Sequence, residues 1–234
     1  MAASPPQLRV LIIEPHSDDG VISAGGLLGR LKASHDLYFA MIVASDLTMH
    51  HGGLVTRDQR IDEYAAYVDH FGGHWIRRLG DGTVLPLDAD SNLDQYPRKD
   101  LVRTVEEIIS IARPNLLLVN GPSFHHDHTA VYEAVIAALR PTARYLPDEV
   151  LIMENPTYVH SSGPAFQFVP DTYAALSEEE LTEKVLVFEQ CFPSQVRSDE
   201  NYLSTAGIRS WARYRGMEAR VEYAEAFRTF IRRI

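Results

Sequence analysis

The sequence predicts an α/β protein in which helices cover both faces of a mostly parallel sheet. Short apolar runs of strand length alternate along the chain with longer segments that have helical periodicity. Strands and helices that alternate in this way build parallel sheets, because each helix carries the chain back across the sheet. We therefore expect a Rossmann-like three-layer sandwich that forms one domain over residues 1–234.

The strands are predicted from apolar runs of strand length. In chain order we expect them at residues 8–13, 37–44, 75–79, 116–119 and 149–153. The first run is apolar except for Arg9, and the fourth reads Leu-Leu-Leu-Val. Continuous runs of this kind are typical of strands that are covered on both faces.

The helices are predicted from their periodicity and from the signals at their ends. In chain order we expect them at residues 21–31, 56–72, 100–112, 129–139, 177–190 and 211–230. Thr56 and Gln59 have the spacing of a capping box, as do Ser177 and Glu180. Gly72 ends the first of these two helices. The polar segments between the elements are expected to be loops, at 45–55, 80–99 and 154–175.

The composition is that of an ordinary globular domain. Apolar residues make up 45% of the 234 residues, enough for a sizeable core. The formal net charge of -10 argues against a nucleic acid or an anionic membrane as partner. Cys191 is the single cysteine, which excludes an intramolecular disulfide and a multi-cysteine metal site. We find neither a signal peptide nor a run of about 20 apolar residues, so we expect a cytoplasmic protein with no stable membrane insertion.

Two polar clusters each follow a predicted strand and precede a predicted helix. The first is His16-Ser17-Asp18-Asp19, after residues 8–13, and the second is His125-His126-Asp127-His128, after 116–119. Sites in open α/β sheets form at the carboxyl ends of the strands. Taken singly, each cluster is more simply explained as a solvated loop. Two such clusters at the same edge of one sheet favour a shared site.

The spacing within the clusters indicates a metal site. In a turn that enters a helix, positions three apart share a face, so His16 and Asp19 can hold one ion together. His128 is the natural third ligand from the second cluster. Two histidines, one carboxylate and an open position are typical of catalytic zinc. Asp18 cannot easily share that face, and is left as a general base for a water that the metal activates.

The same clusters resemble the two signatures of the LmbE/PIG-L-type zinc deacetylases, which read Pro/Ala-His-Pro-Asp-Asp and His-Pro-Asp-His. Other matches extend the resemblance over about residues 8–230, and include Gly25-Gly26-Leu27-Leu28, Arg60-Ile61-Asp62-Glu63, Arg113-Pro114-Asn115 and Tyr223-Ala224-Glu225-Ala226-Phe227. Ser17 and His126 replace prolines of the signatures, at positions that bind no metal. Gly20 replaces an acid that is common after the Asp pair.

The resemblance implies a role for each matching position. The zinc ligands would be His16, Asp19 and His128. Asp18 would take a proton from the attacking water and later give one to the leaving amine. His125 would stabilise the tetrahedral oxyanion.

Four further positions are candidates for the surroundings of the site. By resemblance, Asp127 would orient and charge the His125 ring, and Arg60 would contact substrate hydroxyls. Asp46 lies at the end of the second strand and can face the pocket. Tyr158 lies in the segment where family members often place a mobile pocket residue. The pair His50-His51 either lines the substrate mouth or is simply exposed on its loop.

The predicted function is a hydrolase acting on linear amides. With Zn²⁺ as cofactor, it would remove an acyl group, first of all acetyl, from an N-acylated amino sugar or glycoconjugate. The alternative with the same site is an amidase that cleaves a thiol or glycopeptide conjugate. The expected partner is thus a small-molecule or glycoconjugate substrate. The family analogy leaves a homo-oligomer open.

Two other classes of protein fit the sequence less well. In a nucleotide-binding Rossmann module, the glycines at 20, 25 and 26 would have to form Gly-x-Gly-x-x-Gly, and they do not. Two acids in the phosphate turn would also repel a pyrophosphate. An inactive binding protein on the same scaffold is disfavoured because every catalytic position is filled.

Overall fold

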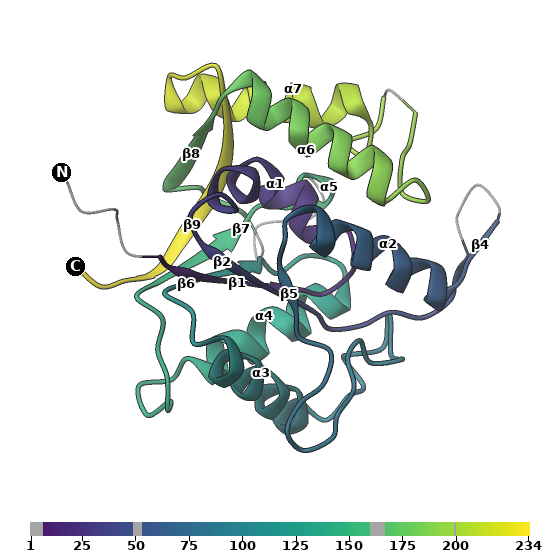
Figure 1. Ribbon diagram of the computed structural model, residues 1–234, viewed down its shortest axis with the longest axis vertical. Coiled ribbons are helices and arrows are strands. Elements are labelled where there is room, and N and C mark those ends of the chain that lie inside the picture. Colours follow the sequence, from purple (N-terminus) through teal and green to yellow (C-terminus); the bar gives the residue numbers. More distant parts are fainter. Residues whose placement is uncertain (1–6, 49–52, 160–166, 199) are drawn as a thin grey trace.

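The computed structural model describes residues 7–48, 53–159, 167–198 and 200–234, with only the backbone for Tyr158 and Val159. Among these residues the centre is a seven-stranded sheet in the order β5-β2-β1-β6-β7-β9-β8 (Figure 1). Its strands are β1 (Arg9–Glu14), β2 (Asp36–Met41), β5 (His74–Trp75), β6 (Leu116–Asn120), β7 (Glu149–Met153), β8 (Thr172–Leu176) and β9 (Tyr223–Arg232). Neighbours from β5 to β7 pair in parallel, whereas β9 runs antiparallel to β7 and β8. The predicted α/β class is confirmed.

Helices cover both faces of this sheet. They are α1 (Asp19–Leu31), α2 (Arg57–His70), α3 (Arg98–Ala112), α4 (His126–Ala138), α5 (Pro156–Val159), α6 (Glu178–Cys191) and α7 (Thr205–Ala219). One face is covered by α1, α2, α6 and α7, and the other by α3 and α4 (Figure 1). The side chains of β1 alternate between the two cores, with Ile12 in the first and Ile13 in the second. Burial on both faces explains why the β1 run is continuously apolar.

The C-terminal part of the chain differs from the prediction. The expected helix at 211–230 is wrong, because α7 ends at Ala219 and the following residues form β9. Arg220 adopts a left-handed backbone (φ 58) that ends the helix. The next residues pair with both β7 and β8, and this pairing overrides the helical composition of Ala-Glu-Ala. The segment expected as a loop at 154–175 also supplies most of β8.

The smaller differences lie at element ends. The helix expected at 129–139 begins at His126, so the second polar cluster occupies its first turn. The strand expected at 75–79 overlaps the two-residue strand β5 only at Trp75. Within the loop expected at 45–55, β3 (Leu47–Thr48) and β4 (Leu54–Val55) form a hairpin. Across the described ranges, no helix combines the length and apolar character needed to cross a membrane.

The sheet register determines where the polar clusters lie. β1 pairs in parallel with β6, and Ile13 lies opposite Val119. The two strands therefore end at the same level, and the turns into α1 and α4 leave the sheet side by side. This arrangement brings together residues more than 100 positions apart in the sequence.

Candidate metal centre and catalytic residues

The turn between β1 and α1 folds around one carboxylate. The backbone N–H of His16 donates to Oδ2 of Asp19 at 2.8 Å. The His16 ring follows the same carboxylate, with Nδ1 at 3.4 Å from Oδ2. Both side chains are buried. The predicted spacing of three positions therefore does place the two side chains together.

The turn between β6 and α4 presents its side chains inward. His125 caps α4, and its Nδ1 accepts a hydrogen bond from the backbone N–H of Asp127 at 3.3 Å. Asp127 and His128 then lie in the first turn of the helix, and both are completely buried. The free-energy cost of burying them is offset by contacts with His16 and Asp19 of the β1 turn and with backbone N–H groups of the loop at 80–99.

The two turns meet in a compact group of metal-ligating atoms. His128 Nε2 lies 3.3 Å from Asp19 Oδ1. One ligand atom each from His16, Asp19 and His128 lies within 4.8 Å of the other two. The three predicted ligands are therefore brought together, and the donor set of two imidazoles and one carboxylate fits a zinc ion.

Asp18 stands next to this group without being part of it. It precedes the first residue of α1, is only partly buried, and makes no side-chain hydrogen bond that caps the helix. Loss of solvent and the neighbouring Asp19 carboxylate raise the pKa of Asp18 to about 6. A carboxyl group with such a pKa can take up and release a proton near neutral pH.

The pKa values of Asp19 and His125 are lowered, whereas that of Asp18 is raised. Burial alone would raise the pKa of Asp19, but the His128 and His16 rings hold it well below the usual range. Burial and the two neighbouring imidazoles lower the pKa of His125 to about 4. At neutral pH His125 is therefore uncharged while Asp19 is ionised.

Asp127 lies nearer to His16 than to His125. Its Oδ2 is 3.1 Å from His16 Nε2 and 4.0 Å from His125 Nδ1. The backbone N–H groups of Ser91 and Leu93 donate to its two oxygens, at 2.6 and 3.0 Å. The carboxylate that was predicted to orient His125 thus lies closer to His16, a predicted metal ligand, and also anchors the loop at 80–99.

Asp90, on that loop, was missed by the sequence reasoning. Its Oδ1 lies 3.3 Å from His16 Nε2, and its carboxylate pairs with Arg60. A second group of metal-ligating atoms within 4.8 Å of one another combines Asp90 with His16, His125 and Asp127. Arg60 itself is buried on α2, and also donates to the Ser45 carbonyl at 3.0 Å. The predicted substrate-binding arginine is therefore held inside the protein by Asp90.

A comparison with known families decides the assignment. The family model described as "PIG-L: GlcNAc-PI de-N-acetylase" matches residues 11–139, which is more than half of the chain. The chain belongs to the PIG-L family. Both polar clusters lie within the matched region, and the resemblance to N-deacetylases that was drawn from them is confirmed. No protein among the curated sequences matches the chain.

Solved structures share the whole fold of this PIG-L chain at low identity. A conserved protein from Thermus thermophilus superposes with a TM-score of 0.71 and 19% identity, over 97% of each chain. GalB, the 4-carboxy-2-hydroxymuconate hydratase of Pseudomonas putida, gives 0.69 and 20%, over 97% of this chain and 98% of its own. The pseudoaglycone deacetylase Dbv21 gives 0.68 and 21%, over 95% and 96%. At these identities the similarity shows the fold, which a hydratase and a deacetylase share.

Of the other predicted pocket residues, the structure describes the side chain of Asp46 but not those of Tyr158, His50 and His51. Asp46 is exposed, and its Oδ1 accepts a hydrogen bond from the backbone N–H of Arg57, the first residue of α2, at 2.7 Å. Tyr158 belongs to α5, but its side chain lies outside the described residues. His50 and His51 also lie outside them.

A buried glutamate occupies the space beside Gly20, which replaces the acid that is common after the Asp pair in the resembled signature. Glu14 ends β1, and its Oε1 accepts a hydrogen bond from the Gly20 N–H at 2.8 Å. The Tyr64 hydroxyl donates to its other oxygen. A Cβ on residue 20 would lie 2.0 Å from Glu14 Oε1. A side chain at position 20 is therefore excluded by a carboxyl group that comes from position 14.

Proposed function

We propose that this protein is a zinc-dependent N-deacetylase that removes an acyl group, first of all acetyl, from an N-acylated amino sugar or glycoconjugate. The observation that carries the proposal is the buried convergence of His16, Asp19 and His128, whose ligand atoms lie within 4.8 Å of one another. Membership of the PIG-L family supports the reaction class. The shared fold of the deacetylase Dbv21 is consistent with it.

The donor set at this site suits zinc, held by His16, Asp19 and His128. The ion, when bound, would polarise the amide carbonyl and acidify a water molecule. Asp19 offers ionised oxygen at neutral pH, because the two imidazoles lower its pKa. The His16 ring is oriented from its other side by Asp127, as is common for metal-bound histidines.

Asp18 is the proposed general base. Residue Asp18 is partly exposed beside the three proposed ligands. Its carboxyl group can therefore reach the attacking water molecule without being a ligand itself. With a pKa raised to about 6, it can accept the proton of the attacking water and release it to the leaving amine. Asp19 cannot do this, because its ionised form is too strongly stabilised.

His125 is the proposed oxyanion donor. Its Nδ1 accepts the backbone N–H of Asp127, so the neutral ring carries its proton on Nε2. A neutral imidazole with this tautomer can donate a hydrogen bond to an oxygen that becomes negative in the transition state. The lowered pKa of His125 keeps the ring in this form at neutral pH.

Substrate contacts are proposed for Arg60, Asp46 and Tyr158. Arg60 is engaged by Asp90, and Asp46 by the start of α2. A sugar hydroxyl would therefore have to join or replace these contacts. The alternative substrate, a thiol or glycopeptide conjugate, would use the same reacting groups.

The test is metal analysis followed by a substrate screen. Purified protein should carry about one zinc per chain, as a three-ligand site implies. The zinc-loaded protein should release acetate from at least one member of a panel of N-acetylated sugars, glycolipids and glycosylated antibiotics. Cleavage of larger amides or thiol conjugates alone would favour the alternative amidase. Absence of bound divalent metal together with no activity on added zinc would contradict the proposal, as would tight metal-free binding of NAD or ATP.

A further inference from the structure

We propose that Asn155 is a positioning residue for the Asp19 carboxylate, and that a buried cluster on helix α7 keeps Asn155 in place. This inference rests on the proposed function, because it assigns Asp19 to the metal. It adds a contribution from the C-terminal part of the chain, which lies outside the region matched to the family at 11–139.

Asn155 is fixed at both ends of its amide. It follows β7, is buried, and its Nδ2 donates to Asp19 Oδ1 at 2.8 Å. Its own Oδ1 accepts the backbone N–H of Thr157 at 3.1 Å. Because a backbone N–H can only donate, the amide oxygen must face Thr157 and the NH₂ group must face Asp19.

The hydrogen bond from Asn155 determines the plane of the carboxylate. Asp19 Oδ2 accepts the backbone N–H of His16 at 2.8 Å, and Oδ1 accepts from Asn155. Oδ1 is also the oxygen that lies 3.3 Å from His128 Nε2. With one donor on each oxygen, the protein itself holds the carboxylate between the two histidines. Without Asn155 the carboxylate could rotate about its side-chain bonds, and ligand atoms would have to be reordered on binding.

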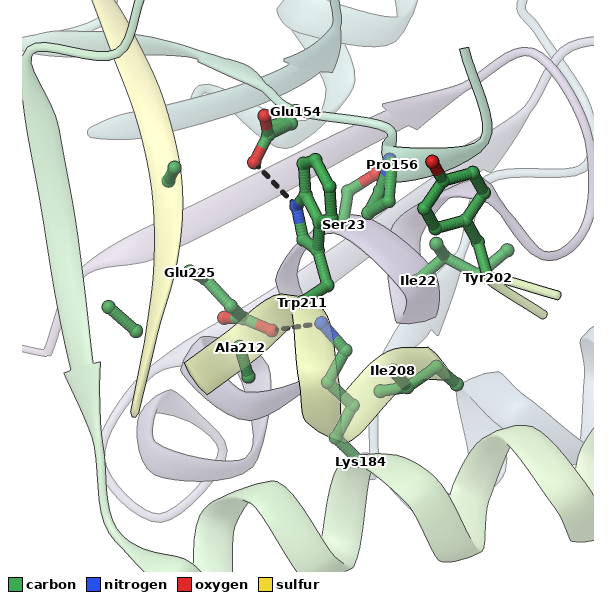
Figure 2. A pocket seen from close by; sticks show the side chains of 12 residues that line it. Ile22, Ser23, Glu154, Pro156, Lys184, Tyr202, Ile208, Trp211, Ala212 and Glu225 are labelled. Carbon is green, nitrogen blue, oxygen red and sulfur yellow. Dashed lines mark hydrogen bonds and ion pairs between the residues drawn. The ribbon is translucent and has the colours of Figure 1, made fainter. Parts of the chain in front are cut away.

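Asn155 is itself held through the preceding residue, Glu154. The Glu154 carboxylate accepts from the Trp211 indole and from the Arg215 guanidinium, each at 2.9 Å, and a second guanidinium nitrogen also bonds to it. Figure 2 shows the bond between Glu154 and Trp211. Both partners of Glu154 lie on α7, and Glu154 and Arg215 are buried. The end of β7 is therefore tied to α7 by one residue and to the metal ligands by the next.

The first experiment compares zinc affinity in two asparagine variants. Asn155→Ala removes the donor to Asp19. Asn115→Ala is the matched control, because Asn115 also donates to an aspartate (Asp148, 2.9 Å) and accepts a backbone N–H (Arg9, 3.1 Å), at the opposite edge of the sheet. Zinc dissociation constants are measured by competition with a chelator, and thermal midpoints are measured on metal-free protein. We expect N155A to bind zinc about 10- to 100-fold more weakly than wild type, as for other residues that support metal ligands. N115A should bind zinc as wild type does.

A volume-matched variant covers the case in which N155A does not fold. Asn155→Leu keeps the volume of the side chain and lacks the donor, so it should show the same loss of zinc affinity. If either folded variant binds zinc as tightly as wild type, the inference is overturned while the proposed function stands. If wild type itself binds no zinc, the proposed function fails, independently of both variants.

The contribution of α7 is tested separately with Trp211→Phe, which removes the indole donor to Glu154 and keeps an aromatic ring. We expect a loss of zinc affinity smaller than for N155A and larger than for N115A. An affinity equal to wild type would overturn the part of the inference that concerns α7.

Discussion

Helix α1 meets two groups of buried polar side chains, one at its N-terminal end and one along its middle. At the end, Asp19 lies among the imidazoles of His16 and His128. Along the middle, Glu225 of β9 accepts the backbone N–H groups of Gly26 and Leu27, at 2.9 and 2.8 Å. Lys184 of α6 donates to the same carboxylate at 2.7 Å (Figure 2).

The two groups differ in how their charges are balanced. In the middle of α1, one carboxylate meets one ammonium and two N–H donors, and the adjoining cavity is only ≈ 20 Å³, room for about one water molecule. At the end of α1, the carboxylates of Asp19, Asp90 and Asp127 surround His16. Among the described residues at this end of α1, Arg60 is the only permanently charged cation that pairs with these carboxylates.

This difference is consistent with a structural role for the group in the middle of α1 and with the proposed metal site at its N-terminal end. Buried charges are tolerated when they are paired and hydrogen-bonded, and the Glu225–Lys184 pair satisfies that condition without a ligand. An excess of buried carboxylates beside imidazoles would instead be stabilised by a bound cation. The variants below test this comparison, starting with the largest expected effect.

Asp18→Asn tests the proposed general base at the N-terminal end of α1. The substitution removes the proton acceptor and keeps the size of the side chain, so we expect kcat to fall by about 10²- to 10⁴-fold. Zinc content should stay at the wild-type value, since the proposed ligands are untouched. Asp62→Asn, which alters an exposed carboxylate on α2, is the control and should leave kcat unchanged. Loss of zinc from D18N would mean that the roles of Asp18 and Asp19 are reversed.

Lys184→Met tests the ion pair between Lys184 and Glu225 beside the middle of α1. The substitution leaves the Glu225 charge buried without its ammonium, so we expect the free energy of unfolding to fall by about 3–5 kcal/mol. Urea denaturation of the metal-free protein measures this change. In a double-mutant cycle, K184M with Glu225→Gln should cost less than the sum of the single changes, because the two residues interact. A loss below about 1 kcal/mol in K184M would contradict the view that this pair holds the middle of α1.

The cluster of His16, Asp19 and His128 could be predicted because it depends on residue spacing and on the pairing of adjacent strands. Spacing of three positions placed His16 beside Asp19, and the parallel pairing of β1 with β6 placed His128 opposite them. Neither inference depends on the conformation of a long loop. The family match is consistent with this, since it ends at residue 139, soon after the second turn.

The surrounding residues could not be predicted, because they depend on long-range packing. Asp90 is one of four aspartates at 80–99, and its contacts with His16 and with buried Arg60 distinguish it from the others. Asn155 reaches Asp19 from 136 positions away. In β9, Ala224, Glu225 and Ala226 are buried and pair with residues 173–175 of β8, a pairing for which the local sequence carries no periodic signal.

Gly20→Ala gives the smallest expected effect. It tests whether the carboxyl group of Glu14 is fixed against the turn that carries Asp18 and Asp19. Alanine inside a helix is ordinarily more favourable than glycine by about 1 kcal/mol. At position 20 the new Cβ would lie 2.0 Å from Glu14 Oε1 and 2.7 Å from the Tyr67 hydroxyl, both on buried side chains. We therefore expect G20A to lower the free energy of unfolding by about 1–3 kcal/mol, as overpacking does.

Gly29→Ala in the same helix is the matched control for G20A. Its Cβ would meet only the end of the Glu183 side chain, which is not fully buried and can turn away. This variant should therefore keep the wild-type stability or gain up to about 1 kcal/mol in urea denaturation. If G20A and G29A have the same stability, the Glu14 carboxyl group can leave its position. In that case Glu14 does not fix the turn that carries Asp18 and Asp19, contrary to what the structure indicates.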